Sequence, residues 1–439
     1  MADDVRCGRG ENPLLGGARG GFPYHLVSTA TLHTRYPEHP TFLAVIRGLT
    51  TRMKLAYTTI YDVRDRRCWP STQLGLCQAG LAIAQTLETL GFTIEYVGGL
   101  TKPRSLITKL KWEFYNKVQQ RDYYRWAEPA IVRDYNRQVQ SQLNAIDYDL
   151  ILAAENCLPI ATLAPKTPMV LWTDAPLSAL MDYYPYMSNL CRETRQNIYR
   201  FEKQAINRCS KVVYASDWAA NHAILTYKLP SSKVAVIPWG ANWQEMPNEA
   251  EIQAAIAQRP QDICQLLWVG VDWTRKGGDI ALAVSDWLNQ NGIPTQLTVA
   301  GIVPDSILEK NPQIRYVGYL DKDNSQQYQQ LKELFLNSHF FILPVQAESY
   351  GHVFCEAQGF ALPCITHQTG GIASILQDPK TGWCLPINSP IERYGQLILD
   401  TFKNPVQYKI IAQAAYDNYQ MSLNWKTACH SLTKILETL

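Results

Sequence analysis

Two glutamates, Glu348 and Glu356, stand eight residues apart in the most chemically informative stretch of this chain. Gly351 lies between them and marks a helix start, where free backbone N–H groups can face a diphosphate. A carboxylate accepts both hydroxyls of a cis-diol, and each charge-assisted bond contributes about 1.5 to 3 kcal/mol. The spacing predicts one ligand held at two places, a sugar ring and a ribose. The alternative is a pair of solvated glutamates on a helix surface.

Further positive charge lies upstream, at Arg275 and Lys276. The apolar run 266–269 predicts a buried strand that ends at Gly270, and the two cations open the next predicted helix. Cations and helix N–H groups stabilise the negative charge that grows on a leaving phosphate. The alternative is a cationic helix start on the surface.

Asp174 follows another predicted strand, residues 169–172, and precedes Ala175 and Pro176. Its carboxylate can bind a sugar or acceptor hydroxyl at the end of that strand. Equally, an Asp before Ala-Pro suits the N-cap of the following helix. The two interpretations stay open.

A basic and aromatic segment covers residues 101–138, which hold nine Lys or Arg and four acidic residues. Basic residues beside interfacial aromatic side chains are typical of a helix that lies on an anionic membrane. Residues 101–126 are therefore a candidate for peripheral membrane contact. The alternative is an inserted helical pair that packs its aromatic side chains inward.

The composition is that of an ordinary globular protein, with 46% hydrophobic and 18% charged residues. A net charge of +2 gives no indication of nucleic-acid binding. No apolar run approaches the roughly 18 residues that span a bilayer, and no secretory signal is visible. The eleven cysteines lack metal-ligand spacing, so we expect reduced thiols, no bound metal and a cytoplasmic location.

From residue 53 onward, short apolar runs alternate with amphipathic stretches, which predicts parallel sheets covered by helices. The pattern breaks around residues 238–240. We therefore expect an α/β fold with two doubly wound, Rossmann-like domains that face a cleft, with ligands beyond the carboxyl ends of the strands. The predicted strands are 55–61, 93–97, 150–154, 169–172, 211–214, 234–237, 265–269, 296–300, 314–317, 340–343 and 363–366.

Residues 1–52 differ from the rest of the chain, because they hold seven glycines and four prolines but no lysine. No helical or strand period persists there, which indicates loop or disordered chain. We expect either a disordered tail or an upstream extension, with translation starting at Met53.

The motif around Glu348 resembles the Glu-x7-Glu signature of glycosyltransferase family 4, which has the GT-B fold. The match continues through residues 356–363 and 369–372, and the resemblance spans residues 53–439, strong in the second predicted domain and loose in the first. The resemblance implies that Glu348 contacts the donor sugar and that Glu356 contacts the ribose. It also implies an acceptor-side domain at 53–240, a nucleotide-sugar domain at 241–420 and a last helix, 421–439, that crosses back. The donor-binding residues that it implies are Gly270, Arg275, Lys276, Tyr319, Tyr350, Gly351, His352, Val353 and Glu356.

The resemblance implies a retaining, hexosyl-type transferase without a cofactor or metal, whose co-substrate is a UDP- or GDP-linked sugar. Glu348 and Asp174 would be catalytic. On the acceptor side, the first loop would contribute Arg66, Ser71 and Thr72, although a surface network of arginine and aspartate is the alternative. The acceptor would be a glycan or a lipid, with the enzyme peripheral on the inner face of the membrane in the lipid case.

Two departures from the family pattern leave rival functions open. The arginine that follows the glycine at Gly270 is replaced by Val271 and Asp272, so Arg275 would supply the charge. The histidine that many relatives place after the central strand is absent at Asp174. A catalytically degenerate nucleotide-sugar-binding protein is therefore the main alternative, and an epimerase or phosphorylase on the same fold is another.

Overall fold

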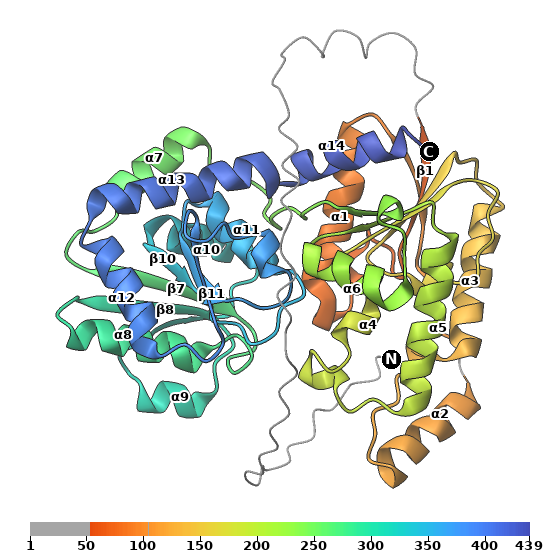
Figure 1. Ribbon diagram of the computed structural model, residues 1–439, viewed down its shortest axis with the longest axis horizontal. Coiled ribbons are helices and arrows are strands. Elements are labelled where there is room, and N and C mark those ends of the chain that lie inside the picture. The colour runs from red at the N-terminus through yellow and green to blue at the C-terminus, as the bar shows by residue number, and fades with distance from the viewer. Residues whose placement is uncertain (1–52, 104) are drawn as a thin grey trace. The chain divides into compact units, whose positions relative to one another are not determined.

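The computed structural model of the chain describes residues 53–103 and 105–439. The predictions for residues 1–52 therefore lie outside the described residues. Two six-stranded sheets are present, with strands paired in parallel and in the orders β2-β1-β3-β4-β5-β6 and β12-β11-β10-β7-β8-β9. Each order reverses beside its first strand, as in doubly wound sheets. The predicted α/β fold class with two Rossmann-like units is confirmed (Figure 1).

The strands are short, and the segments that carry the two sheets are called the first half (β1 to β6) and the second half (β7 to β12). The first half contains β1 (Lys54–Thr58), β2 (Thr93–Val97), β3 (Leu150–Ala154), β4 (Met169–Thr173), β5 (Lys211–Tyr214) and β6 (Val234–Val236). The second half contains β7 (Cys264–Gly270), β8 (Thr295–Gly301), β9 (Arg315–Gly318), β10 (Phe340–Ile342), β11 (Cys364–His367) and β12 (Gly382–Leu385).

Helices alternate with these strands along the chain. The first half has α1 (Leu74–Thr89), α2 (Leu106–Glu113), α3 (Pro129–Leu143), α4 (Leu177–Leu180), α5 (Arg192–Arg208) and α6 (Asp217–Tyr227). After β6 follow α7 (Glu249–Gln258), α8 (Gly278–Gln290), α9 (Asp305–Lys310), α10 (Ser325–Asn337), α11 (His352–Gly359), α12 (Ile391–Phe402), α13 (Pro405–Ser422) and α14 (Trp425–Leu436).

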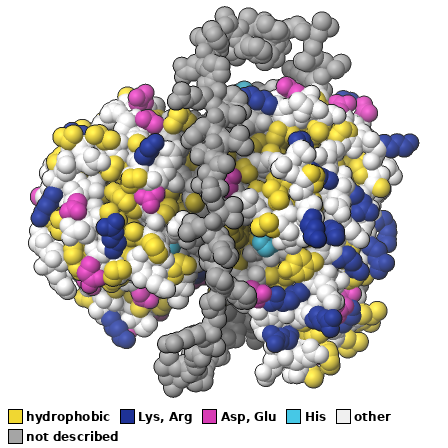
Figure 2. All heavy atoms as spheres, viewed as in Figure 1, with side chains coloured by type: hydrophobic (Ala, Val, Ile, Leu, Met, Phe, Trp, Pro, Cys, Tyr) yellow, Lys and Arg dark blue, Asp and Glu magenta, His cyan; other side chains and the backbone are white. Residues whose placement is uncertain are grey.

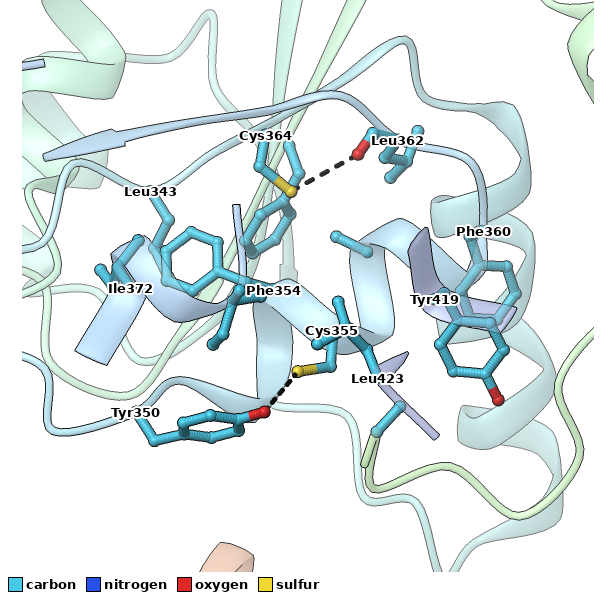
Figure 3. Packing of buried hydrophobic residues seen from close by; sticks show 14 of the residues in the cluster. Leu343, Tyr350, Phe354, Cys355, Phe360, Leu362, Cys364, Ile372, Tyr419 and Leu423 are labelled. Atoms are coloured by element: carbon cyan, nitrogen blue, oxygen red, sulfur yellow. Dashed lines mark hydrogen bonds between the residues drawn. The ribbon is translucent and has the colours of Figure 1, made fainter. Parts of the chain in front are cut away.

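The first sheet is buried on both faces, as a parallel sheet between helices requires. Along β1, Leu55 and Tyr57 belong to the hydrophobic cluster that includes α1 and α14, whereas Ala56 belongs to the cluster of α3 and α5. In the second half, Phe354 and Cys355 turn the inner face of α11 into the core, where Phe354 packs with Leu343 (Figure 3).

Most predicted strands agree with the structure to within a residue at each end, but two elements differ by more and one strand was missed. β1 ends at Thr58 instead of continuing to residue 61, because Thr59 turns the chain and its hydroxyl donates to the Tyr61 carbonyl at 2.7 Å. The amphipathic pattern of residues 80–90 predicts a helix there, but α1 begins earlier, at Leu74. β12 was not predicted, since its sequence Gly-Trp-Cys-Leu carries no β-branched residue.

The C-terminal helices reach both halves. α13 packs against α11, and α14 packs against α1, where the Cys429 thiol lies 3.9 Å from the Ile83 carbonyl (Figure 1). Trp425 at the start of α14 forms an aromatic cluster with Trp172 of β4 and Trp239 of the segment after β6, with ring centroids 6.0 to 6.5 Å apart. Trp239 also stacks on the His352 ring at 5.4 Å, so this cluster lies beside the segment that carries Glu348 and Glu356.

Candidate active site

Glu348 lies in the loop after β10, 9% exposed, and faces two cations from the loop before α8. The ammonium of Lys276 bonds its Oε2 atom, and Nη1 of Arg275 lies 3.4 Å from the same oxygen. The Arg275 guanidinium also donates to the Ala347 carbonyl at 2.9 Å. The structure therefore brings together the two charged motifs that the sequence places 72 residues apart.

The charges of Lys276 and Arg275 decide the state of Glu348. Burial alone would raise the pKa of its carboxyl, but the two cations outweigh that effect and lower the pKa below its ordinary value. Glu348 is therefore ionised at neutral pH. The arrangement can bind an anion at the cations and a hydroxyl at the carboxylate.

The loop that carries these cations depends on Gly277, the N-cap of α8, which has a φ of +68°. A Cβ atom at this position would lie 2.1 Å from the carbonyl oxygen of Pro344, so the loop can approach the end of β10 only with glycine. Gly270, at the end of β7, is also crowded, because a Cβ there would meet the Trp268 ring at 2.9 Å.

Glu356 is the fifth residue of α11, so it stands one turn into the helix. It is buried, which excludes the solvated-surface interpretation. Lys322 donates to its Oε1 atom at 2.6 Å and to the Asn242 carbonyl at 2.9 Å. Burial raises the pKa of the Glu356 carboxyl, and the nearby Lys322 charge opposes that rise.

Gly351 is the N-cap of α11 with a φ of +102°, and the helix begins at His352 as expected. The His352 ring is neutral, because burial lowers its pKa to about 4, and its Nδ1 atom lies 2.9 Å from the Gly240 carbonyl. The Tyr350 hydroxyl donates to the Trp239 carbonyl at 2.6 Å and lies beside Cys355 (Figure 3). These side chains are used for structure, which leaves backbone N–H groups such as that of Val353 as the donors at this helix start.

Asp174 reaches the second half. Its Oδ2 atom accepts a bond from the Ser349 hydroxyl at 2.7 Å, and its Oδ1 atom accepts from the Ala175 amide at 2.8 Å. Burial raises the pKa of this carboxyl. The N-cap of α4 is Pro176, so Asp174 does not cap that helix.

No contact joins Arg66 or Thr72 to Glu348 in the described part of the chain. The Arg66 guanidinium forms an ion pair with Asp323 of the second half and donates to Gln78 at 2.9 Å. Thr72 is exposed, and Ser71 has a side chain that lies outside the described part. Tyr319, just after β9, is 52% exposed and makes no contact with either glutamate among those found.

Three site residues have no counterpart in the sequence prediction. Tyr183 and Tyr184 bond the backbone of the Glu348 loop from the first half, and Lys322 pairs with Glu356. A Tyr-Tyr pair and a loop lysine carry no recognisable spacing signal. Only the folded contacts identify them.

Known proteins resemble this chain in sequence and in fold. Residues 251–418, which include both glutamates and both cations, match the family model described as glycosyl transferases group 1. Among solved structures, sucrose-phosphate synthase from Thermosynechococcus elongatus is similar over 88% of this chain and 99% of its own, with a TM-score of 0.63 and 14% identity. The chain has the GT-B glycosyltransferase fold.

Two further proteins are similar to this chain, one in structure and one in sequence. HepE of Anabaena, solved in complex with UDP and glucose, is 15% identical with a TM-score of 0.55 and covers 88% of this chain and 100% of its own. The gpi3 subunit of the phosphatidylinositol N-acetylglucosaminyltransferase of Schizosaccharomyces pombe is 19% identical over 242 residues, 54% of this chain. The match spans 50% of that relative's length.

Proposed function

We propose that this GT-B chain transfers a hexose from a nucleotide-sugar donor to a glycan or lipid acceptor, with retention of the anomeric configuration. The observation that carries the proposal is the buried, ionised Glu348 held by Lys276 and Arg275 beside the N-termini of two helices. The group 1 family match over residues 251–418 supports it.

The site residues have distinct roles in this proposal. The donor diphosphate takes the Lys276 and Arg275 cations together with N–H groups at the start of α11, which stabilise the charge that grows on the leaving phosphate. Glu348 then turns its carboxylate to the sugar hydroxyls, and Glu356 accepts the ribose hydroxyls. The leaving phosphate accepts the acceptor's proton on the same face of the sugar, which retains the configuration.

A lipid acceptor is supported by the surface of α2 and the π-helical turn that follows it, η4 (Phe114–Val118). Large apolar side chains are exposed to solvent there, and Figure 2 shows apolar and basic side chains side by side in this region. Exposed lysines, Lys109 and Lys117, flank them. The exposed fractions are Leu106 80%, Ile107 66%, Leu110 70%, Trp112 43%, Phe114 47% and Val118 69%.

An apolar stripe flanked by cations fits the interface of an anionic membrane, where each basic residue contributes about 1 kcal/mol. We therefore place the enzyme on the cytoplasmic face of a membrane as a peripheral protein. No described helix is long and apolar enough to cross a bilayer. The inward-packing interpretation holds for Tyr123, which is buried, but not for Trp112.

Nucleotide release tests the proposal. The purified chain is incubated with UDP-, GDP- and ADP-sugars, each with and without anionic lipid extract. Release of one nucleotide that rises when lipid is added is the expected result. If a nucleotide-sugar binds but no nucleotide is released with any acceptor, the alternative of a catalytically degenerate nucleotide-sugar-binding protein is supported instead.

A further inference from the structure

The Glu348 loop is held by two consecutive tyrosines from the other half of the molecule. Tyr183 and Tyr184 follow α4 in the first half, whereas Glu348 and Ser349 follow β10 in the second half. The Glu348 amide donates to the Tyr183 hydroxyl at 2.9 Å, and the Ser349 amide donates to the Tyr184 hydroxyl at 2.7 Å. Two adjacent backbone N–H groups of the donor loop are thus paired across the two halves.

Each phenol also has an acceptor for its own proton, so the pairing is complete. The Tyr183 hydroxyl lies 3.2 Å from the Glu348 carbonyl and 2.8 Å from the Thr369 hydroxyl. The Tyr184 hydroxyl lies 3.5 Å from Oε1 of the Glu348 carboxylate. A phenol hydroxyl can accept one hydrogen bond and donate another at the same time, and both tyrosines have partners for both roles here.

Packing fixes both rings in place. Tyr183 lies against Trp218, with centroids 4.9 Å apart, and Tyr184 stacks on Tyr186 at 5.1 Å. The Arg275 guanidinium lies 5.6 Å over the Tyr184 ring, so the cation that pairs with Glu348 also contacts the tyrosine.

The approach of the tyrosines also depends on Gly370, whose φ is +52°. A Cβ atom there would lie 2.4 Å from the Tyr183 hydroxyl and 1.9 Å from the Glu348 carbonyl. The loop after β11 therefore leaves room for this contact only with glycine at that position.

We propose that Tyr183 and Tyr184 are positioning residues that orient the Glu348 carboxylate from the acceptor-side half. The inference rests on the proposed transfer reaction. Since the tyrosines act through the loop, they set the geometry in which Glu348 meets the reacting sugar. Their loss should lower turnover more than donor affinity, because the cations and helix N-termini that hold the diphosphate stay in place.

Tyr184→Phe and the double variant Tyr183→Phe/Tyr184→Phe test this role, with Tyr186→Phe as the matched control. Tyr186 is 58% exposed and stacks on the same ring, and its phenol makes no hydrogen bond to the Glu348 loop among those found. We expect kcat to fall about tenfold in the double variant with donor KM changed less than threefold, and Tyr186→Phe to match the wild type. Unchanged kcat, or a rise in donor KM alone, would overturn the positioning role.

Backbone amide hydrogen exchange over residues 344–353 of the full chain gives a readout that does not need activity. The double variant should exchange faster there than the wild type and the control, because two N–H groups lose their partners. Faster exchange in the double variant, combined with a wild type that transfers no sugar, would contradict the proposed function but would still support the contact. Exchange equal to that of the wild type would contradict the contact itself.

Discussion

Glu348 and Glu356 have the same side chain but different surroundings. Two cations lower the pKa of Glu348, whereas the single Lys322 does not offset the burial that raises the pKa of Glu356. The lowered pKa keeps the Glu348 carboxylate ionised, so that it can pair with the two cations and accept hydrogen bonds from hydroxyls. At the residue scale, the site is thus a balance between desolvation and charge.

His339 provides a pH-dependent test of burial. It is 3% exposed, accepts the Gln265 amide at 3.0 Å, and burial with the Arg259 charge lowers its pKa to about 4 from 6.5. The unfolded chain takes up a proton below pH 6.5 that the native state excludes, so stability is full above that pH and is lost as pH falls toward 4. From pH 7.5 to 5, we expect this residue to remove about 2 kcal/mol of unfolding free energy.

Urea unfolding of His339→Asn, which keeps an acceptor for the Gln265 amide, checks that value. The variant should lose less stability between pH 7.5 and 5 than the wild type. His430→Asn is the control, because His430 is exposed. Equal pH dependence of His339→Asn and the wild type would contradict the assignment.

At the scale of elements, the loop from β7 to α8 places Lys276 and Arg275 because Gly277 tolerates both a left-handed φ and close contact with Pro344. We expect Gly277→Ala to cost at least about 2 kcal/mol in stability and to weaken nucleotide binding. Gly75→Ala, in the first turn of α1 with nothing within 4 Å, is the control and should be neutral in chemical denaturation. Equal stability of the two variants would show that the loop relaxes without glycine.

The exposed stripe of α2 makes a separate prediction about membranes. Leu106→Glu/Leu110→Glu should abolish cosedimentation with vesicles that contain anionic lipid, because two charges replace the two most exposed apolar side chains of α2. Leu225→Glu is the matched control, since Leu225 is 78% exposed on α6, away from this stripe in the sequence. Binding that survives the α2 double variant would assign the stripe to another partner.

Strands and helix starts were predictable because they depend on local patterns. Buried apolar runs marked 11 of the strands, and Gly351 marked the start of α11, whereas α8 begins only after Arg275 and Lys276, which were expected to open it. The short β12 was missed because four residues without branching carry little signal. Contacts between residues far apart in the sequence could not be predicted, because no local pattern encodes them. An example is the bond between Tyr183 and Glu348, which are 165 residues apart.

At the scale of the whole molecule, the site is assembled from both halves. Asp174, Tyr183 and Tyr184 of the first half bond the loop of Glu348 and Ser349, while Lys276 and Arg275 come from the second. The aromatic cluster of Trp172, Trp239 and Trp425 joins the same halves behind the donor motif.

Glu348 is proposed to act in sugar transfer, and the turnover of Glu348→Ala is the measurement that tests this role. With the donor that the wild type uses, the variant should lose about 2.7 to 4 kcal/mol of transition-state stabilisation, a fall of roughly 100- to 1,000-fold in kcat. Glu333→Gln, on the exposed face of α10, is the control and should turn over like the wild type. Near-normal nucleotide release by Glu348→Ala would contradict a role of Glu348 in sugar transfer.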